Sequence, residues 1–143
     1  MLVDAIMNAD VVTCTRDHTV LRAARIMREK DVGSVVVVDD RQRPIGFLTD
    51  RDIATKCVAQ GRSPETPIDE VMSSPVHAVP RDTLIFDTLR EMSRRKVHRM
   101  PVLDADKRLV GVVSVDDALL LLTTELVNVA DVMGYRTRIL NQE

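Results

Sequence analysis

The sequence predicts a mixed α/β fold of the α+β kind, in which two pseudo-symmetric units, each a small β-sheet flanked by helices, pack sheet to sheet. Two observations support this prediction. The chain of 143 residues aligns with itself at an offset of 65 residues without a gap, as from Gly46 to Gly111. Within each half, segments with helical periodicity alternate with short apolar segments typical of strands.

The internal repeat is established by identical residues. At this offset, thirteen residues of the first half align with an identical residue in the second half. Ordinary residue frequencies would supply about three such matches. The repeated residues of the first half are Asp4, Met7, Val11, Arg16, Asp17, Arg25, Met27, Val32, Val37, Asp39, Arg43, Gly46 and Asp52. We therefore expect the two halves to fold alike.

Each half is expected to begin with a short helical turn, VDAIM or IDEVM, followed by a brief strand at Val11–Thr13 or Val76–Val79. Two further strands come later in each half. In the first half these are the apolar run SVVVVDD, typical of a strand covered on both faces, and PIGFL after a polar turn. The segment MPVLDADKRLVGVV repeats this pattern in the second half.

Helices are expected between the first and second strands and at the end of each half. The apolar spacing i, i+3, i+4, i+7 predicts the first of these helices. Its apolar face contains Val20, Ala23, Ala24 and Met27, and in the second half Ile85, Thr88, Leu89 and Met92. Asp17 and Asp82 lie where an N-cap is useful. The closing helices are expected at Ile53–Gln60, with Gly61 as C-cap, and from Asp116 onward.

These elements divide the chain into two units with a linker between them. We expect a first unit at residues 2–60, a turn-rich linker at 61–67, a second unit at 68–124 and a C-terminal helical tail at 125–143. A unit of about 60 residues buries too little surface to be comfortably stable alone. We therefore expect the two units to share one core.

Composition excludes several classes of function. The net charge of −2 gives no electrostatic reason to expect nucleic-acid binding. The longest apolar run, ALLLL at 118–122, is far shorter than the roughly 20 residues that span a membrane. The N-terminus does not resemble a secretory signal, and two cysteines form no disulfide framework. We expect a cytoplasmic protein without membrane or nucleic-acid partners.

The segments GFLTDRD and GVVSVDD place a hydroxyl and a carboxylate three residues apart at a strand-to-helix corner, as Thr49 with Asp52 and Ser114 with Asp117. This spacing fits a capping box, which satisfies free helix N–H groups. The same corner suits a nucleoside phosphate, because the hydroxyl can donate to phosphate and the carboxylate can accept both ribose hydroxyls. The glycine that opens each segment is expected to let a ligand approach the strand.

These two segments, the strand HRMPVLD and the order of the elements resemble a tandem of cystathionine-β-synthase (CBS) domains, often called a Bateman module. The resemblance covers about Leu2 to Thr124. It implies two clefts between facing units that bind AMP, ADP, ATP or S-adenosylmethionine and thereby regulate a partner protein. It also implies a homodimer, a flat disc of four units.

The resemblance also implies the binding residues. Asp52 and Asp117 match the aspartates that bind ribose, and Thr49 and Ser114 match the hydroxyls beside the phosphates. The segment KVHRMPVLD makes His98 and Arg99 candidates for phosphate contacts, Arg99 being favoured because a guanidinium binds phosphate in a forked geometry. The adenine slots would be lined by Met100, Pro101, Ser34, Val35 and Val36.

The two halves differ at the expected phosphate contacts. Where the second half has His98 and Arg99, the first has Gly33 and Ser34, and Asp50 adds a negative charge that Val115 lacks. We therefore expect unequal sites, one of which holds phosphates more tightly.

Three alternatives remain open. An enzyme is not favoured, because no G-x-S-x-G, P-loop or H-E-x-x-H motif occurs, so we expect neither catalysis nor a required cofactor. Zinc binding would have to use Cys14, His18, Cys57, His77 and His98, which lack the usual ligand spacing. A scaffold that binds no ligand would retain both corners as simple caps.

The C-terminal segment continues with helical periodicity. Its apolar side contains Leu126, Val127, Ala130 and Met133, and Gly134 is a plausible end. We expect this helix to cover part of the module or a second copy of it. The segment IATKCVAQ and the ALLLL helix are the candidate faces of a homodimer interface.

Overall fold

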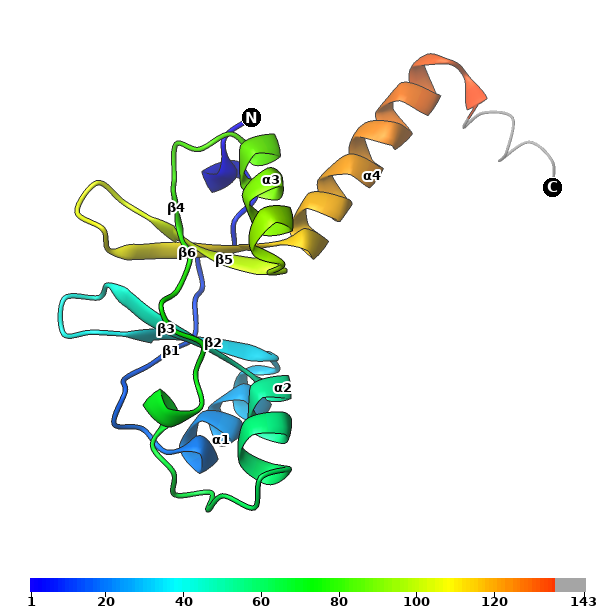
Figure 1. Ribbon diagram of the computed structural model, residues 1–143. Helices are drawn as coiled ribbons and strands as arrows, with labels where there is room; N and C mark the ends of the chain where they lie inside the picture. The colour runs from blue at the N-terminus through cyan, green and yellow to red at the C-terminus, as the bar shows by residue number, and fades with distance from the viewer. Residues whose placement is uncertain (136–143) are drawn as a thin grey trace, which may run out of the picture.

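The computed structural model describes residues 1–135, which form two three-stranded sheets that face each other (Figure 1). The strand order is β1-β2-β3 in the first sheet and β4-β5-β6 in the second. Helices cover the outer side of each sheet, so the layers run helix, sheet, sheet, helix (Figure 1). The predicted fold class is confirmed.

The first sheet consists of β1 (Thr13–Cys14), β2 (Ser34–Val38) and β3 (Pro44–Thr49). β1 pairs with β2 in parallel, with helix α1 (Val20–Lys30) as the crossover, and β2 and β3 form an antiparallel hairpin. Asp39 stabilises the hairpin turn, because its carboxylate accepts the backbone N–H groups of Arg41 and Arg43 at 2.8 and 2.9 Å.

The second sheet repeats this arrangement with β4 (Val79–Pro80), β5 (Arg99–Leu103), β6 (Leu109–Ser114) and the crossover helix α3 (Ile85–Arg95). The registers correspond at the offset of the repeat: Val36 lies opposite Phe47, and Pro101 lies opposite Val112. β1 and β4 begin later than predicted, because the residues before them cross between the two units instead of extending a sheet.

Helices α1 and α3 bury the predicted faces, through Val20, Ala23 and Met27 in α1 and Ile85, Thr88 and Met92 in α3. The prediction of their N-caps was wrong. α1 is capped by Thr19, whose hydroxyl accepts the Arg22 N–H at 3.2 Å, and α3 follows Leu84, which makes no side-chain cap. Asp17 instead accepts a hydrogen bond from the Thr15 hydroxyl at 2.5 Å, and this bond lowers the pKa of the Asp17 carboxyl.

The helical turn at the start of each half packs on the opposite unit. Turn η1 (Val3–Ala5) lies on the second unit, where the Val3 N–H donates to the Thr83 carbonyl at 2.8 Å. Turn η3 (Ile68–Glu70) lies on the first unit, where the Ile68 N–H donates to the His18 carbonyl at 2.9 Å. Val3 and Ile68 complete two separate buried clusters in residues 1–135. The expectation of one shared core was therefore wrong.

We call η1 and η3 the exchanged turns, because each packs on the unit formed by the other half of the chain. A methionine that follows each exchanged turn packs directly on a glycine in the sheet of that other unit. Met72 lies on Gly46 of β3, and a Cβ atom at Gly46 would lie 2.2 Å from the methionine Sδ. Met7 lies on Gly111 of β6, where the corresponding distance is 2.4 Å. We expected these glycines to admit a ligand. That expectation was wrong, because methionine side chains fill the space.

The closing helices of the two halves differ. In the first half, α2 (Asp50–Asp52) continues into the π-helical turn η2 (Ile53–Val58), and the chain reverses at Gly61, which has φ +66°. In the second half, α4 (Val115–Val132) runs on into the expected helical tail and is followed by Gly134 with φ +73°. The last part of that predicted tail, residues 136–143, lies outside the described residues.

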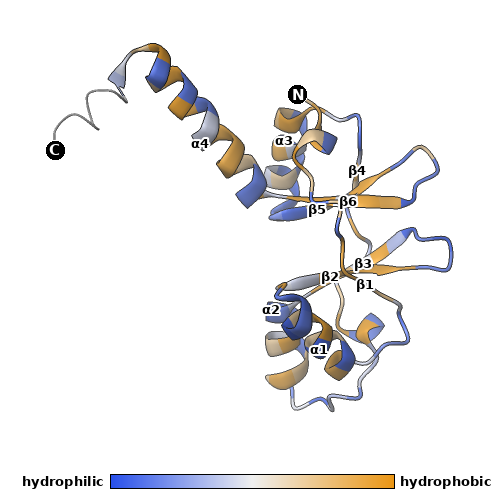
Figure 2. Cartoon of the chain, turned by 180° about the vertical axis from the view of Figure 1, so that it is seen from behind, coloured by the Kyte–Doolittle hydropathy of each residue, from blue (hydrophilic) through white to orange (hydrophobic). Residues whose placement is uncertain are grey.

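Helix α4 extends away from both sheets and does not cover the module (Figures 1 and 2). Large apolar side chains along it are exposed, including Leu119, Leu120, Leu126 and Val132. Within the described part of the chain, no helix is both long and apolar enough to cross a membrane.

The contact between Met7 and Gly111 generates the first prediction. Gly111→Ala should lower the free energy of unfolding by about 1–3 kcal/mol, because the new methyl group overpacks the space that Met7 fills. Met7→Ala should also destabilise, by leaving a cavity. In urea titrations the double variant should be more stable than the sum of the single effects predicts, by at least about 0.5 kcal/mol. Additive effects would show that the two side chains are not in contact.

Candidate functional site

Two chain segments cross between the facing sheets. Residues 8–12 lead from the second unit to β1, and residues 73–78 lead from the first unit to β4 (Figure 1). Each segment is fixed by a backbone bridge, Asn8 with Val112 and Ser73 with Phe47. Each segment also lines one of two clefts between the units.

The Thr49 cleft has a volume of about 560 Å³ and combines the corner at the end of β3 with the start of β5 in the other unit. It is lined by Phe47, Thr49, Asp50, Arg51, Asp52, Ser73, Pro75, Val76, His77, Lys96, Val97, His98 and Arg99. The structure thus brings together four residues that sequence analysis placed at a nucleotide site, namely Thr49, Asp52, His98 and Arg99.

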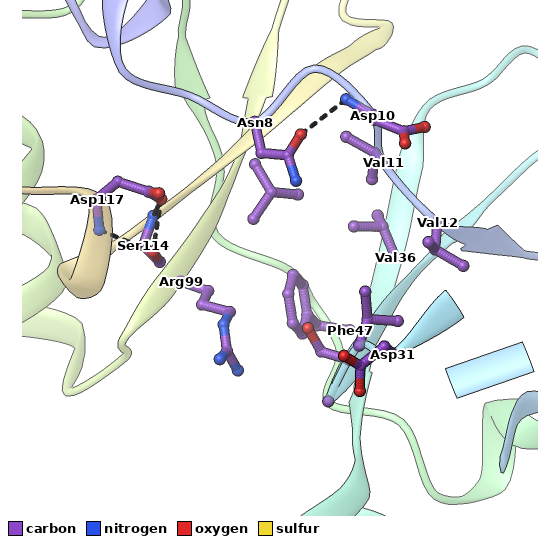
Figure 3. Close-up of a pocket in the computed structure, with 14 residues that line it drawn as sticks. Asn8, Asp10, Val11, Val12, Asp31, Val36, Phe47, Arg99, Ser114 and Asp117 are labelled. Carbon is purple, nitrogen blue, oxygen red and sulfur yellow. Dashed lines mark hydrogen bonds between the residues drawn. The ribbon is translucent and has the colours of Figure 1, made fainter. Parts of the chain in front are cut away.

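The Ser114 cleft is smaller, with a volume of about 290 Å³. It combines the corner at the end of β6 with the start of β2, and is lined by Asn8, Asp10, Val11, Val12, Asp31, Val32, Gly33, Ser34, Val36, Phe47, Arg99, Val112, Ser114 and Asp117. Figure 3 shows Ser114 and Asp117 on one side of this cleft and Val36 and Phe47 on the other. The side chain of Arg99 extends into the space between these two pairs.

Both corners are capping boxes. Thr49 Oγ1 accepts the Asp52 N–H at 3.0 Å, and Asp52 Oδ2 accepts the Thr49 N–H at 3.0 Å. In the second unit, Ser114 Oγ accepts the Asp117 N–H at 3.2 Å, and Asp117 Oδ2 accepts the Ser114 N–H at 2.8 Å. These bonds hold both pairs of side chains at the edge of a cleft.

The hydroxyl groups of the two corners differ in what they can donate. The Ser114 hydroxyl lies 2.5 Å from Asp117 Oδ2 and donates to it. Among the residues that the structure describes, the Thr49 hydroxyl donates to no acceptor, so its proton is available at the cleft edge. A phosphate oxygen is an acceptor, so Thr49 is the better placed of the two to bind it.

The two carboxylates also differ. Lys56 Nζ lies 2.8 Å from Asp52 Oδ1 and 3.3 Å from the Ser73 hydroxyl, so it ties the corner to the crossing segment. The equivalent position in the second half is Leu121, which cannot form such an ion pair. Asp117 Oδ1 therefore keeps its acceptor capacity for a ligand.

The charges that line the clefts are unequal. The Ser114 cleft contains three acidic residues, Asp10, Asp31 and Asp117, and one basic residue, Arg99. The Thr49 cleft contains three basic residues and two acidic ones, together with two histidines: Arg51, Lys96, Arg99, Asp50, Asp52, His77 and His98. Electrostatics therefore favour an anionic ligand in the Thr49 cleft and disfavour one in the Ser114 cleft.

The residues expected at the adenine slots separate into two groups. Ser34 and Val36 line the Ser114 cleft, whereas Val35, Met100 and Pro101 line neither cleft. Val35 and Met100 belong to the buried clusters between each sheet and its helices. They face away from the clefts, because alternate residues of a strand face opposite sides of the sheet. Pro101 is fully buried at the position that corresponds to Val36.

The lining residues from the crossing segments, such as Asn8, Val12, Ser73 and Val76, were not predicted from the sequence. These residues belong to no recognisable motif. Only their position could have identified them, because both segments occupy the same place in the repeat, between a helical turn and the first strand of a sheet.

Of the candidate zinc ligands, His77 and His98 line the same cleft, but the structure does not gather a complete ligand set. Within residues 1–135, no three histidine, cysteine or acidic side chains form a group that could hold a metal ion. Cys14 is buried in the first apolar cluster, and burial raises the pKa of its thiol. Cys57 is also buried, with Sγ 3.7 and 3.6 Å from the carbonyl oxygens of Arg62 and Ser63.

Comparison with known proteins identifies relatives across most of the chain. It is 40% identical over 114 residues to hypoxic response protein 1 of Mycobacterium tuberculosis, covering 78% of each chain. A crystal structure of Hypoxic Response Protein I with two coordinated zinc ions has a TM-score of 0.75 at 35% identity, and the match covers 83% of this chain and 97% of the other. Uncharacterized protein MK0525 of Methanopyrus kandleri is 35% identical over 118 residues, which are 82% of this chain and 60% of that protein.

Structural similarity extends to a protein crystallised with adenosine derivatives. The CBS domain pair of protein MJ0100, in complex with 5′-methylthioadenosine and S-adenosyl-L-methionine, has a TM-score of 0.79 at 26% identity, covering 87% of this chain and 98% of the other. The family model for the CBS domain matches residues 3–58 and 68–124. The chain therefore belongs to the CBS domain family, as a tandem pair.

Proposed function

We propose that the chain is a regulatory module that senses adenosine nucleotides, with AMP, ADP, ATP or S-adenosylmethionine bound between the two CBS units and no catalysis of its own. The observation that carries this proposal is the repeated corner. Thr49 with Asp52, and Ser114 with Asp117, each place a hydroxyl and a carboxylate at the edge of a cleft between the sheets. The crystallised MJ0100 pair supports the adenosine class of ligand.

In this proposal the ribose hydroxyls bind the carboxylate of a corner, and the adenine ring lies against apolar side chains deeper in the cleft. The Ser114 cleft offers Val12, Val36 and Val112 for the ring, and the Thr49 cleft offers Val76 and Val97. Aliphatic side chains suit a planar ring by dispersion and by exclusion of water.

Phosphate groups are proposed to bind in the Thr49 cleft. Lys96, His98 and Arg99 line it, and the Thr49 hydroxyl is free to donate. Charge-assisted hydrogen bonds from Lys and Arg to phosphate are stronger than neutral ones. The Ser114 cleft has one basic side chain and an engaged hydroxyl, which supports the prediction of unequal sites.

The regulatory output is proposed to pass through a partner protein or through the shape of a homodimer. Two surfaces are candidates for the dimer contact, the apolar side of α4 and the η2 segment. Leu120, Leu126 and Val58 are each 69% exposed and are available for such contacts.

The sensing proposal is tested by removing both carboxylates. In Asp52→Ala plus Asp117→Ala, AMP should no longer raise the melting temperature, whereas AMP at about 100 times its Kd should stabilise the unmodified protein by about 2.7 kcal/mol. Thermal shift or calorimetry measures this difference. The matched control is Thr19→Ala, which removes a helix cap outside both clefts at a cost of about 1 kcal/mol and should retain the response to AMP. No response in the unmodified protein would favour a ligand-free scaffold.

The position of the phosphate is tested with Lys96→Gln. AMP affinity should fall about threefold, as expected for loss of an exposed charge contact, while adenosine affinity should not change. The matched control is Lys107→Gln. Lys107 shares the left-handed backbone of Lys96, with φ 65° against 56°, but lines neither cleft. Equal loss for AMP and adenosine would contradict a phosphate contact at Lys96.

The dimer is tested by placing charges on the two candidate surfaces. Leu120→Asp plus Leu126→Asp should convert the dimer to a folded monomer in analytical ultracentrifugation if α4 forms the contact, because burying unpaired carboxylates is costly. Val58→Asp tests the other surface with a side chain of the same exposure. An unmodified protein that sediments as a monomer at micromolar concentration would contradict the homodimer.

A further inference from the structure

Arg99 occupies a position that no other basic residue of the described chain shares. It lies at the start of β5, opposite Ser114, and within residues 1–135 it is the only basic side chain that lines both clefts. The side chain is exposed and forms neither an ion pair nor a side-chain hydrogen bond in the described chain. Arg99 is therefore free to serve a ligand on either side.

One guanidinium carries a single positive charge, which phosphates in both clefts would have to share. The Thr49 cleft has other basic groups, Lys96 and Arg51, beside Arg99. The Ser114 cleft has Arg99 alone against Asp10, Asp31 and Asp117. When a phosphate in the Thr49 cleft engages Arg99, the Ser114 cleft is left with three carboxylates and no basic side chain. A cationic ligand then binds there more favourably and an anionic one less favourably.

We propose that Arg99 couples the two clefts, so that a phosphate-bearing adenosine ligand in the Thr49 cleft promotes binding of a cationic adenosine ligand in the Ser114 cleft and opposes a second phosphate there. This inference rests on the proposed function, because it requires adenosine ligands in both clefts. Linkage makes the coupling reciprocal, so the cationic ligand strengthens binding of the phosphate ligand by the same factor. The module then responds to two ligands of opposite charge taken together.

The test uses isothermal titration calorimetry on the full chain with three probes. AMP supplies the phosphate. S-adenosylmethionine carries a sulfonium and a net positive charge, and S-adenosylhomocysteine lacks the sulfonium methyl and that charge. Saturating AMP should lower the Kd of S-adenosylmethionine at least about fivefold, the lower end of typical allosteric coupling, and should change the Kd of S-adenosylhomocysteine less. The reverse titration should show the same factor.

Three variants separate the coupling from simple binding. Arg99→Gln should reduce the coupling factor to about one, because the shared charge is lost. Arg99→Lys should restore part of it. Lys96→Gln, which alters a residue of the Thr49 cleft alone, should weaken AMP binding but leave the coupling intact. Circular dichroism confirms that each variant is folded, which the exposure of Arg99 and Lys96 favours.

Each other result overturns the inference. Independent binding of AMP and S-adenosylmethionine, competition between them, or coupling that survives in Arg99→Gln would each show that Arg99 does not link the clefts, while the sensing proposal would stand. If none of the three probes bound, the proposed function itself would fail and this inference with it.

Discussion

The fold depends on the exchange of two short turns between the units. Each sheet has a glycine where a methionine from the other half of the chain packs, Met7 on Gly111 and Met72 on Gly46. The turn that carries each methionine also closes the apolar cluster of the receiving unit. Because the turns must reach across, the residues that follow them run between the facing sheets. The exchange therefore determines the position of both crossing segments, and with them one wall of each cleft.

The repeat makes two clefts, and substitutions within it make them chemically different. Both corners keep the capping box, which holds the carboxylates in place. The two corners differ in the residues and hydrogen bonds around the capping box. Lys56 reaches Asp52, whereas Leu121 stands at the equivalent position beside Asp117, and the Ser114 hydroxyl donates to its carboxylate where that of Thr49 does not. A pseudo-symmetric backbone thus holds two sites of opposite electrostatic character.

The sequence was sufficient for the features that depend on local periodicity and on the repeat. The helix faces at Val20 and Ile85, the hairpins and the capping boxes of both corners follow from spacing. The partner unit of each turn could not be predicted, because a short apolar turn fits either cluster equally well by pattern. The role assigned to Gly46 failed for the same reason: an absent side chain marks a close approach but does not identify what approaches. The N-cap of α1 was misplaced because two suitable side chains, Asp17 and Thr19, lie two residues apart and only Thr19 caps the helix.

The exchanged turns also bear on how such a chain arose. One copy of the repeat on its own would expose an apolar turn with its methionine and would leave a bare glycine on its sheet, whereas two copies would satisfy each other. The simplest ancestor is therefore a short polypeptide that assembled in pairs by swapping its first residues. Fusion of two such genes would have joined partners that already depended on each other. Once both copies were inherited together, each was free to acquire its own substitutions, which a symmetric pair of identical chains cannot do.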